Sequence, residues 1–113
     1  MSGITTHVLD TSRGKPASGV PVLLEIRKEG DWREIGRALT DDDGRVRHLL
    51  PEGSSLIPGV YRLTFDLDRY FAAREIEGFY PEASIVFNIR DANQPYHVPL
   101  LLSPFGYSTY RGS

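Results

Sequence analysis

Two histidines near opposite ends of the chain are the residues best suited to move a proton. His7 lies in the strand-like stretch ITTHVLD, and His97 lies in the strand-like stretch YHVPLLLS. A neutral imidazole at either position could take a proton from water near pH 7, as a general base does. A histidine in a strand is more often an ordinary surface or hydrogen-bonded residue, so the residue types alone leave both interpretations open. We interpret the third histidine, His48, as a loop or surface residue.

An arginine follows a short acidic turn in the middle of the chain. The sequence TDDDGR ends in Arg45, which is either a solvated residue of that turn or a guanidinium held in place by it. A fixed guanidinium could bind an anion or polarise a carbonyl group. Calcium binding by this turn is excluded, because an EF-hand loop needs oxygen ligands at its first, third and fifth positions and glycine at its sixth. Gly44 is only fourth from Asp41, and Arg45 would stand among the ligands.

The sequence ends in an aromatic ring, a guanidinium, a glycine and a hydroxyl, carried by Tyr110, Arg111, Gly112 and Ser113. The last residues of most domains fray and carry little information. These four follow directly on a run that reads as ordered strand, YHVPLLLSPFGYSTY. Gly112 permits either a close approach of the backbone or a positive φ. Composition alone does not explain why the last four residues should be ordered and chemically rich.

Several classes of chemistry are excluded by what the sequence lacks. It contains no cysteine, which removes disulfides, thiolate nucleophiles and thiolate-bound zinc. It contains no nucleophile elbow, phosphate-binding loop or dinucleotide fingerprint. Ser108, Thr109 and Ser113 have no evident acid partner, which argues against a covalent acyl-enzyme. Zinc held by histidines alone has no support in the spacing. We expect no metal and no cofactor.

Length and charge indicate a small protein without an affinity for nucleic acid or membranes. The 113 residues suit one domain, residues 1–113. The net charge is −2 and the basic residues form no tract, unlike the basic face of a nucleic-acid-binding protein. We see no signal peptide at the N-terminus and no apolar run of about 20 residues, the length of a membrane helix. We therefore expect a cytoplasmic protein.

Alternation of apolar and polar residues dominates the chain and predicts half-buried strands. The turn signal KEGD predicts a hairpin between residues 20–27 and 32–40. Residues 68–75 break the alternation, and we predict a short helix there that is capped by Asp68 and ends by Gly78. Seven to eight strands with one helix predict an all-β sandwich or barrel. The residues predicted to share the buried face are Val20, Val22, Leu24 and Ile26; Tyr61, Leu63, Phe65 and Leu67; Ile85, Phe87 and Ile89; and Tyr96, Val98, Leu100 and Leu102. His97 lies on the opposite face of its strand, so we expect it to point outward.

Three stretches together resemble the 5-hydroxyisourate hydrolase branch of the transthyretin-related family. They are TTHVLDTSRGKPASGVPVLL near the start, TDDDGR in the middle and YHVPLLLSPFGYSTYRGS at the end, so that the resemblance runs almost from end to end. The resemblance implies a transthyretin-like β-sandwich. It also implies hydrolysis of 5-hydroxyisourate to 2-oxo-4-hydroxy-4-carboxy-5-ureidoimidazoline in urate degradation, by attack of water on a cyclic amide carbonyl, without metal or cofactor.

The resemblance also implies which residues act. It points to His7, Arg45, His97 and Ser113 as catalytic, and to Tyr110, Arg111 and Gly112 as further substrate contacts. It implies a homotetramer, built as a dimer of dimers, whose sites lie in a channel between the dimers. In such an assembly the outward-facing histidines would become cleft residues, and the last residues of the chain would line the channel.

Two other classes of function compete with a hydrolase. A transthyretin-like carrier would bind a small molecule in the tetramer channel without converting it, and would have no need of two histidines, Arg45 and a fixed C-terminal segment. A structural β-sandwich used for adhesion would be expected to carry a signal peptide or tandem domains. A test for acceleration of 5-hydroxyisourate decay separates the hydrolase from both.

Overall fold

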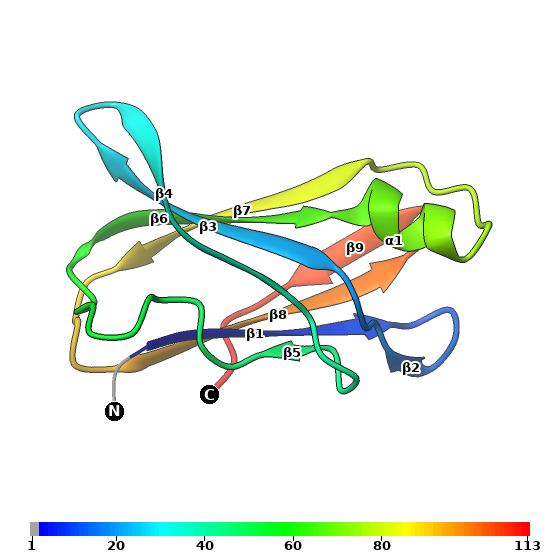
Figure 1. The fold of residues 1–113 in the computed structure, drawn as a ribbon, viewed down its shortest axis with the longest axis horizontal. Helices are drawn as coiled ribbons and strands as arrows, with labels where there is room; N and C mark the ends of the chain where they lie inside the picture. Colours follow the sequence, from blue (N-terminus) through cyan, green and yellow to red (C-terminus); the bar gives the residue numbers. More distant parts are fainter. Residues whose placement is uncertain (1–2) are drawn as a thin grey trace.

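Two β-sheets packed face to face make up the computed structural model, which describes residues 3–113 (Figure 1). The first sheet has the order β2-β1-β8-β9, and β5 pairs with β1 as well. The second has the order β4-β3-β6-β7. The strands of the first sheet are β1 (Gly3–Asp10), β2 (Lys15–Pro16), β5 (Arg45–Val46), β8 (Pro95–Ser103) and β9 (Gly106–Thr109). Those of the second are β3 (Pro21–Lys28), β4 (Asp31–Leu39), β6 (Gly59–Asp66) and β7 (Glu82–Ile89).

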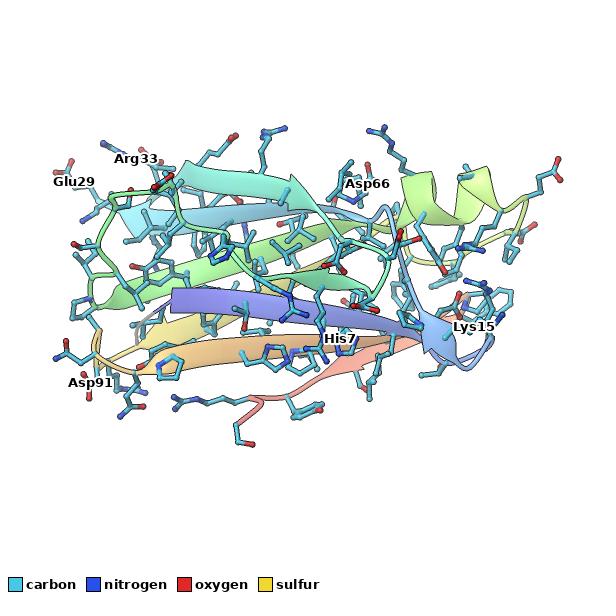
Figure 2. All side chains as sticks on the ribbon, turned by 60° about the horizontal axis from the view of Figure 1, so that its bottom comes forward. His7, Lys15, Glu29, Arg33, Asp66 and Asp91 are labelled. Atoms are coloured by element: carbon cyan, nitrogen blue, oxygen red, sulfur yellow. The ribbon has the colours of Figure 1, made fainter. Side chains whose placement is uncertain are left out.

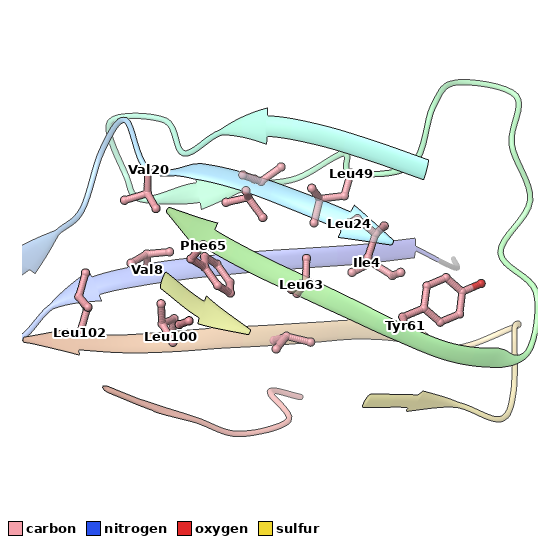
Figure 3. Close-up of a cluster of buried hydrophobic side chains, with 14 of the residues drawn as sticks. Ile4, Val8, Val20, Leu24, Leu49, Tyr61, Leu63, Phe65, Leu100 and Leu102 are labelled. Atoms are coloured by element: carbon pink, nitrogen blue, oxygen red, sulfur yellow. The ribbon is translucent and has the colours of Figure 1, made fainter. Parts of the chain in front are cut away.

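The core lies between the sheets and follows the predicted alternation. Val8 from β1, Leu24 from β3, Leu63 from β6 and Leu100 from β8 are all fully buried (Figure 3). Burial of one such side chain contributes about 1.5–3 kcal/mol relative to its exposure, so a slip of any strand by one residue would be costly. Of the predicted core residues, Ile85 and Phe87 are only partly buried, on the edge strand β7. The predicted all-β sandwich is confirmed.

The predicted hairpin is also confirmed. Strands β3 and β4 pair antiparallel up to Lys28 and Asp31, which leaves a two-residue loop. Both loop residues have positive φ, 52° at Glu29 and 84° at Gly30. This is the conformation that matches the twist of two antiparallel strands.

The helix α1 (Leu67–Ala73) begins and ends slightly earlier than predicted. Its N-cap is Asp66, whose carboxylate accepts a hydrogen bond from the backbone N–H of Arg69 at 3.0 Å. The prediction of Asp68 as the cap is therefore wrong, because a cap must keep a non-helical backbone and Asp66, the last residue of β6, does so. Glu75 reverses the chain after the helix with φ 57°, well before Gly78.

Gly78 has a different role from the predicted helix stop. A Cβ at this position would lie 2.6 Å from Cδ2 of Phe71, a buried residue of α1. The glycine therefore allows the chain to pass against the Phe71 ring.

No helix among residues 3–113 is long and apolar enough to span a bilayer.

Candidate active site

Three neighbouring strands bring His7, Arg45 and His97 to one face of the first sheet. Strand β1 lies between β5 and β8, antiparallel to β5 and parallel to β8. His7 is directly opposite Arg45 on β5, and Thr5, two residues earlier, is directly opposite His97 on β8. The neighbours of these residues along each strand, such as Val46 and Val98, are buried in the core. The three polar side chains therefore face outward, as predicted for His97, and Figure 2 shows His7 near the middle of β1 on this sheet.

The acidic turn before Arg45 holds the backbone of Arg45 in place. The carboxylate of Asp41 accepts hydrogen bonds from the backbone N–H groups of Asp43 and Arg45, both at 2.9 Å. The hydrogen bond from Arg45 and the one from Asp43 outweigh the effect of burial and lower the pKa of Asp41. Gly44 has φ 75°, and a Cβ there would collide with the carbonyl oxygen of Val8. The turn is thus docked on β1, and it fixes the backbone of Arg45 directly opposite His7.

The ring of His97 is held at two of its edges. The hydroxyl Oγ1 of Thr5 is 2.8 Å from Nδ1 of His97. On the other side, a Cβ at Gly112 would lie 2.5 Å from Cδ2 of the same ring. The backbone N–H of Gly112 donates to the carbonyl oxygen of His97 at 2.8 Å, so the C-terminal segment is paired with β8 at this point. Of the two explanations for Gly112, the structure selects the close approach.

The surroundings of His97 favour its neutral form. Partial burial lowers the pKa of His97 below its ordinary value of 6.5, and the electrostatic effects of Arg45 and then His7 lower it further. Burial disfavours the imidazolium because the charged form loses solvation, and nearby cations disfavour it by repulsion. At neutral pH His97 can therefore accept a proton.

The other residues of the C-terminal tetrapeptide are placed differently from Gly112. The guanidinium of Arg111 lies 4.5 Å from the ring centre of Tyr96 and donates to Oε1 of Gln94 at 2.9 Å. Tyr96 belongs to the buried face of β8, so within one chain Arg111 extends away from His97. The side chain of Tyr110 is 59% exposed. Ser113 is exposed and directly follows the glycine that touches His97.

The contact between Thr5 and His97 was missed by sequence reasoning. Alternation places Thr5 on the same face as His7, which is a signal that the residue faces outward. Its partner on β8 depends on the register of a parallel pair, and no local pattern in the sequence gives that register. His48 lies in an exposed loop, as predicted. Within residues 3–113 there is no group of three or more histidine or acidic side chains that could hold a metal ion.

The order of the strands in the two sheets and the short helix after β6 define a transthyretin-like protein. The family model described as "HIUase/Transthyretin family" matches residues 4–112, and the chain belongs to this family. A probable 5-hydroxyisourate hydrolase of Caenorhabditis elegans is 54% identical over 112 residues, which are 99% of this chain and 82% of the relative.

Solved structures from both branches of the family share the fold. The 5-hydroxyisourate hydrolase of Klebsiella pneumoniae has a TM-score of 0.83 and 37% identity, and the match covers 100% of this chain and 94% of that one. Sea bream transthyretin in complex with thyroxine has a TM-score of 0.90 and 31% identity, over 96% of this chain and 93% of the other. The fold is therefore common to an enzyme and a protein that binds thyroxine, and the function depends on the site.

Proposed function

We propose that this protein is a hydrolase that converts 5-hydroxyisourate to 2-oxo-4-hydroxy-4-carboxy-5-ureidoimidazoline, a step of urate degradation. The observation that carries the proposal is the meeting of His7, Arg45 and His97 on one face of three adjacent strands, with the pKa of His97 lowered. The 54% identity to a relative with this name supports the substrate.

The proposed reaction begins with attack of water on the amide carbonyl of the six-membered ring. The water oxygen bonds to the carbonyl carbon while its proton passes to Nε2 of His97. The carbonyl oxygen gains negative charge, which the guanidinium of Arg45 stabilises. The carbon–nitrogen bond then breaks, and the proton passes from the histidine pair to the departing nitrogen. A general base typically contributes about 10²–10⁴-fold, and one oxyanion donor about 10²–10³-fold.

The remaining residues of the proposed site assist His97 and Arg45 in catalysis and in binding. His7 lies beside Arg45 and completes the polar face, where it orients the water or donates to the departing nitrogen. Ser113 and Tyr110 bind the polar rim of the substrate. Arg111 extends towards Tyr96 within one chain, so we assign it to substrate held against a neighbouring subunit.

We further propose a homotetramer, built as a dimer of dimers, in the cytoplasm. The edge strands β7 and β9 each have a strand partner on one side only among the described residues, and such edges are open to pairing with another chain. Phe79 and Phe105, close to these edges, are each 67% exposed. If β7 and β9 pair with the same strands of another chain, the outer face of the first sheet stays free to line a channel.

Light scattering on the purified protein measures the mass of the assembly, and a monomer at micromolar concentration would contradict the proposed tetramer. Cell fractionation tests the location.

The deciding experiment is a rate measurement on freshly prepared 5-hydroxyisourate. Purified protein should accelerate the loss of its near-ultraviolet absorbance, and H97N should abolish most of the acceleration. H48N is the matched control, because His48 is an exposed loop histidine outside the site, and it should act like the parent protein. A carrier predicts binding without acceleration. Unchanged turnover by H97N would remove His97 from the mechanism.

A further inference from the structure

The hydroxyl of Thr5 is the polar group closest to the proposed base and has no other side-chain partner among residues 3–113. Oγ1 lies 2.8 Å from Nδ1 of His97, across the parallel pair of β1 and β8. The contact is part-buried, so water competes with it only in part. Strand pairing on both sides of His97 fixes the two backbones that carry this contact.

The two contacts of the His97 ring leave one nitrogen for chemistry. Thr5 occupies the Nδ1 edge, and Gly112 lies against the Cδ2 edge. These two atoms are the ring neighbours of Cγ, so the far edge, with Nε2 and Cε1, is the part that remains for substrate. Rotation of the ring is opposed at both sides.

We propose that Thr5 is a positioning residue whose hydroxyl accepts a hydrogen bond from Nδ1–H of His97 and thereby keeps the lone pair of the ring on Nε2. The inference rests on the proposed hydrolase function and deepens it. When Nε2 takes a proton from water, the ring becomes an imidazolium and its Nδ1–H still donates to the same hydroxyl. The hydrogen bond to Thr5 is therefore present before and after proton transfer.

An uncharged partner suits this base better than a carboxylate would. A carboxylate at Nδ1 would stabilise the imidazolium and raise the pKa of His97, which would leave less of the base free near neutral pH. A hydroxyl adds no charge at Nδ1, and it favours the Nδ1-protonated tautomer when its own hydrogen is directed away from the ring. The charged and titratable groups that face His97 from the adjacent strands are His7 of β1 and Arg45 of β5. Arg111 of the C-terminal segment turns away towards Gln94.

The test compares T5V, T5S and T64V. Valine keeps the branched shape that a strand favours and removes the hydroxyl, whereas serine keeps the hydroxyl. Thr64 is a matched control, because it lies on β6 in the other sheet, is half-buried and has a hydroxyl 3.2 Å from Oγ of Ser84. T5V should lower kcat/KM by about 10–100-fold, by analogy with the loss of an outer-shell group that orients a metal-bound histidine. T5S should recover most of this loss, and T64V should act like the parent protein.

A second readout does not depend on turnover. In protein with ¹⁵N-labelled histidine, NMR reports which ring nitrogen carries the proton, and the His97 signals are identified by their absence in H97N. The parent protein should hold the proton on Nδ1, and T5V should shift the population towards the Nε2-protonated form. The acid limb of the kcat/KM profile should move to lower pH in T5V, because the imidazolium loses its acceptor.

The outcomes separate this inference from the proposed function. If the parent protein leaves 5-hydroxyisourate untouched while NMR shows the Thr5-dependent tautomer, the proposed function fails and the positioning of His97 stands. If the parent protein is active and T5V keeps both its kcat/KM and its tautomer population, the role of Thr5 is overturned. A loss of activity in T5V with an unchanged tautomer also overturns it. If T5V does not fold, the tautomer of His97 is measured in T5S and in the parent protein instead. A His97 that is protonated on Nε2 in both proteins contradicts the inference.

Discussion

Replacement of Gly112 by alanine should damage activity far more than stability. The added Cβ would lie 2.5 Å from Cδ2 of His97 and 3.2 Å from Cγ. Non-bonded carbon atoms prefer separations of about 3.5–4.0 Å, so the shorter contact has to open by about 1 Å. The backbone is held by the hydrogen bond from the Gly112 N–H to the His97 carbonyl oxygen. The ring is therefore the part that moves, and it is pushed out of its present position towards the hydroxyl of Thr5, which already lies 2.8 Å from Nδ1.

A displacement of about 1 Å in a catalytic group can cost about 100-fold in rate. We therefore expect kcat/KM of G112A to fall by about two orders of magnitude on that basis. The free energy of unfolding should change by less than about 1 kcal/mol, as for other substitutions outside the core. Turnover is measured by the absorbance assay, and stability by urea unfolding of the same preparation.

Gly106 provides the control for this substitution. It lies in β9, in the same C-terminal part of the chain, and a Cβ there would meet only Oγ of Ser103 at 3.7 Å, an ordinary contact. G106A should keep the activity of the parent protein. If G112A also kept it, the tight contact between the C-terminal segment and the His97 ring would have no part in catalysis, and the reasoning would be refuted.

Three further predictions concern the core and the charge of the site. The hydroxyl of Tyr70 donates a hydrogen bond to the buried carboxylate of Asp10 at 2.8 Å. Y70F removes this donor, so it should lower the free energy of unfolding by about 1–3 kcal/mol and leave kcat unchanged. An unaltered urea midpoint would contradict this prediction. Because protonated His97 cannot act as a base and its pKa is lowered, kcat/KM should fall with decreasing pH through a midpoint below 6.5, the ordinary value. R45Q removes a cation that lowers this pKa, so its midpoint should move to higher pH while its maximal rate falls. An unchanged midpoint would show that the charge of Arg45 does not act on His97.

The arrangement of faces could be predicted from the sequence because alternation is a local property. Val22, Leu63 and Leu100 each sit in a run whose period fixes which side is buried, and the same period places His97 outward. The hairpin turn was equally predictable, since Glu29 and Gly30 form a loop of the length and type that antiparallel strands prefer.

Features that depend on distant parts of the chain could not be predicted in this way. The short strand β5 exists because Arg45 and Val46 pair with β1, and two residues carry no periodic signal. The cap of α1 falls on Asp66 rather than Asp68 because β6 continues to that residue. The contact between Thr5 and His97 requires the parallel register of β1 and β8. The resemblance to a family supplied His7, Arg45 and His97 as a group, whereas their geometry comes from the strand pairing.

The parallel pairing of β1 with β8 also bears on how the chain folds. Thr5 and His97 are 92 residues apart in the sequence, so the entropy of closing a long loop opposes their meeting. Contacts of this kind slow folding. The outer edge of β1 can pair early with the nearby residues of β2 and β5, whereas its inner edge must wait for β8. Activity should therefore return during refolding when β8 pairs with β1. A chain that stops folding before that step would expose an unpaired strand edge, which promotes aggregation.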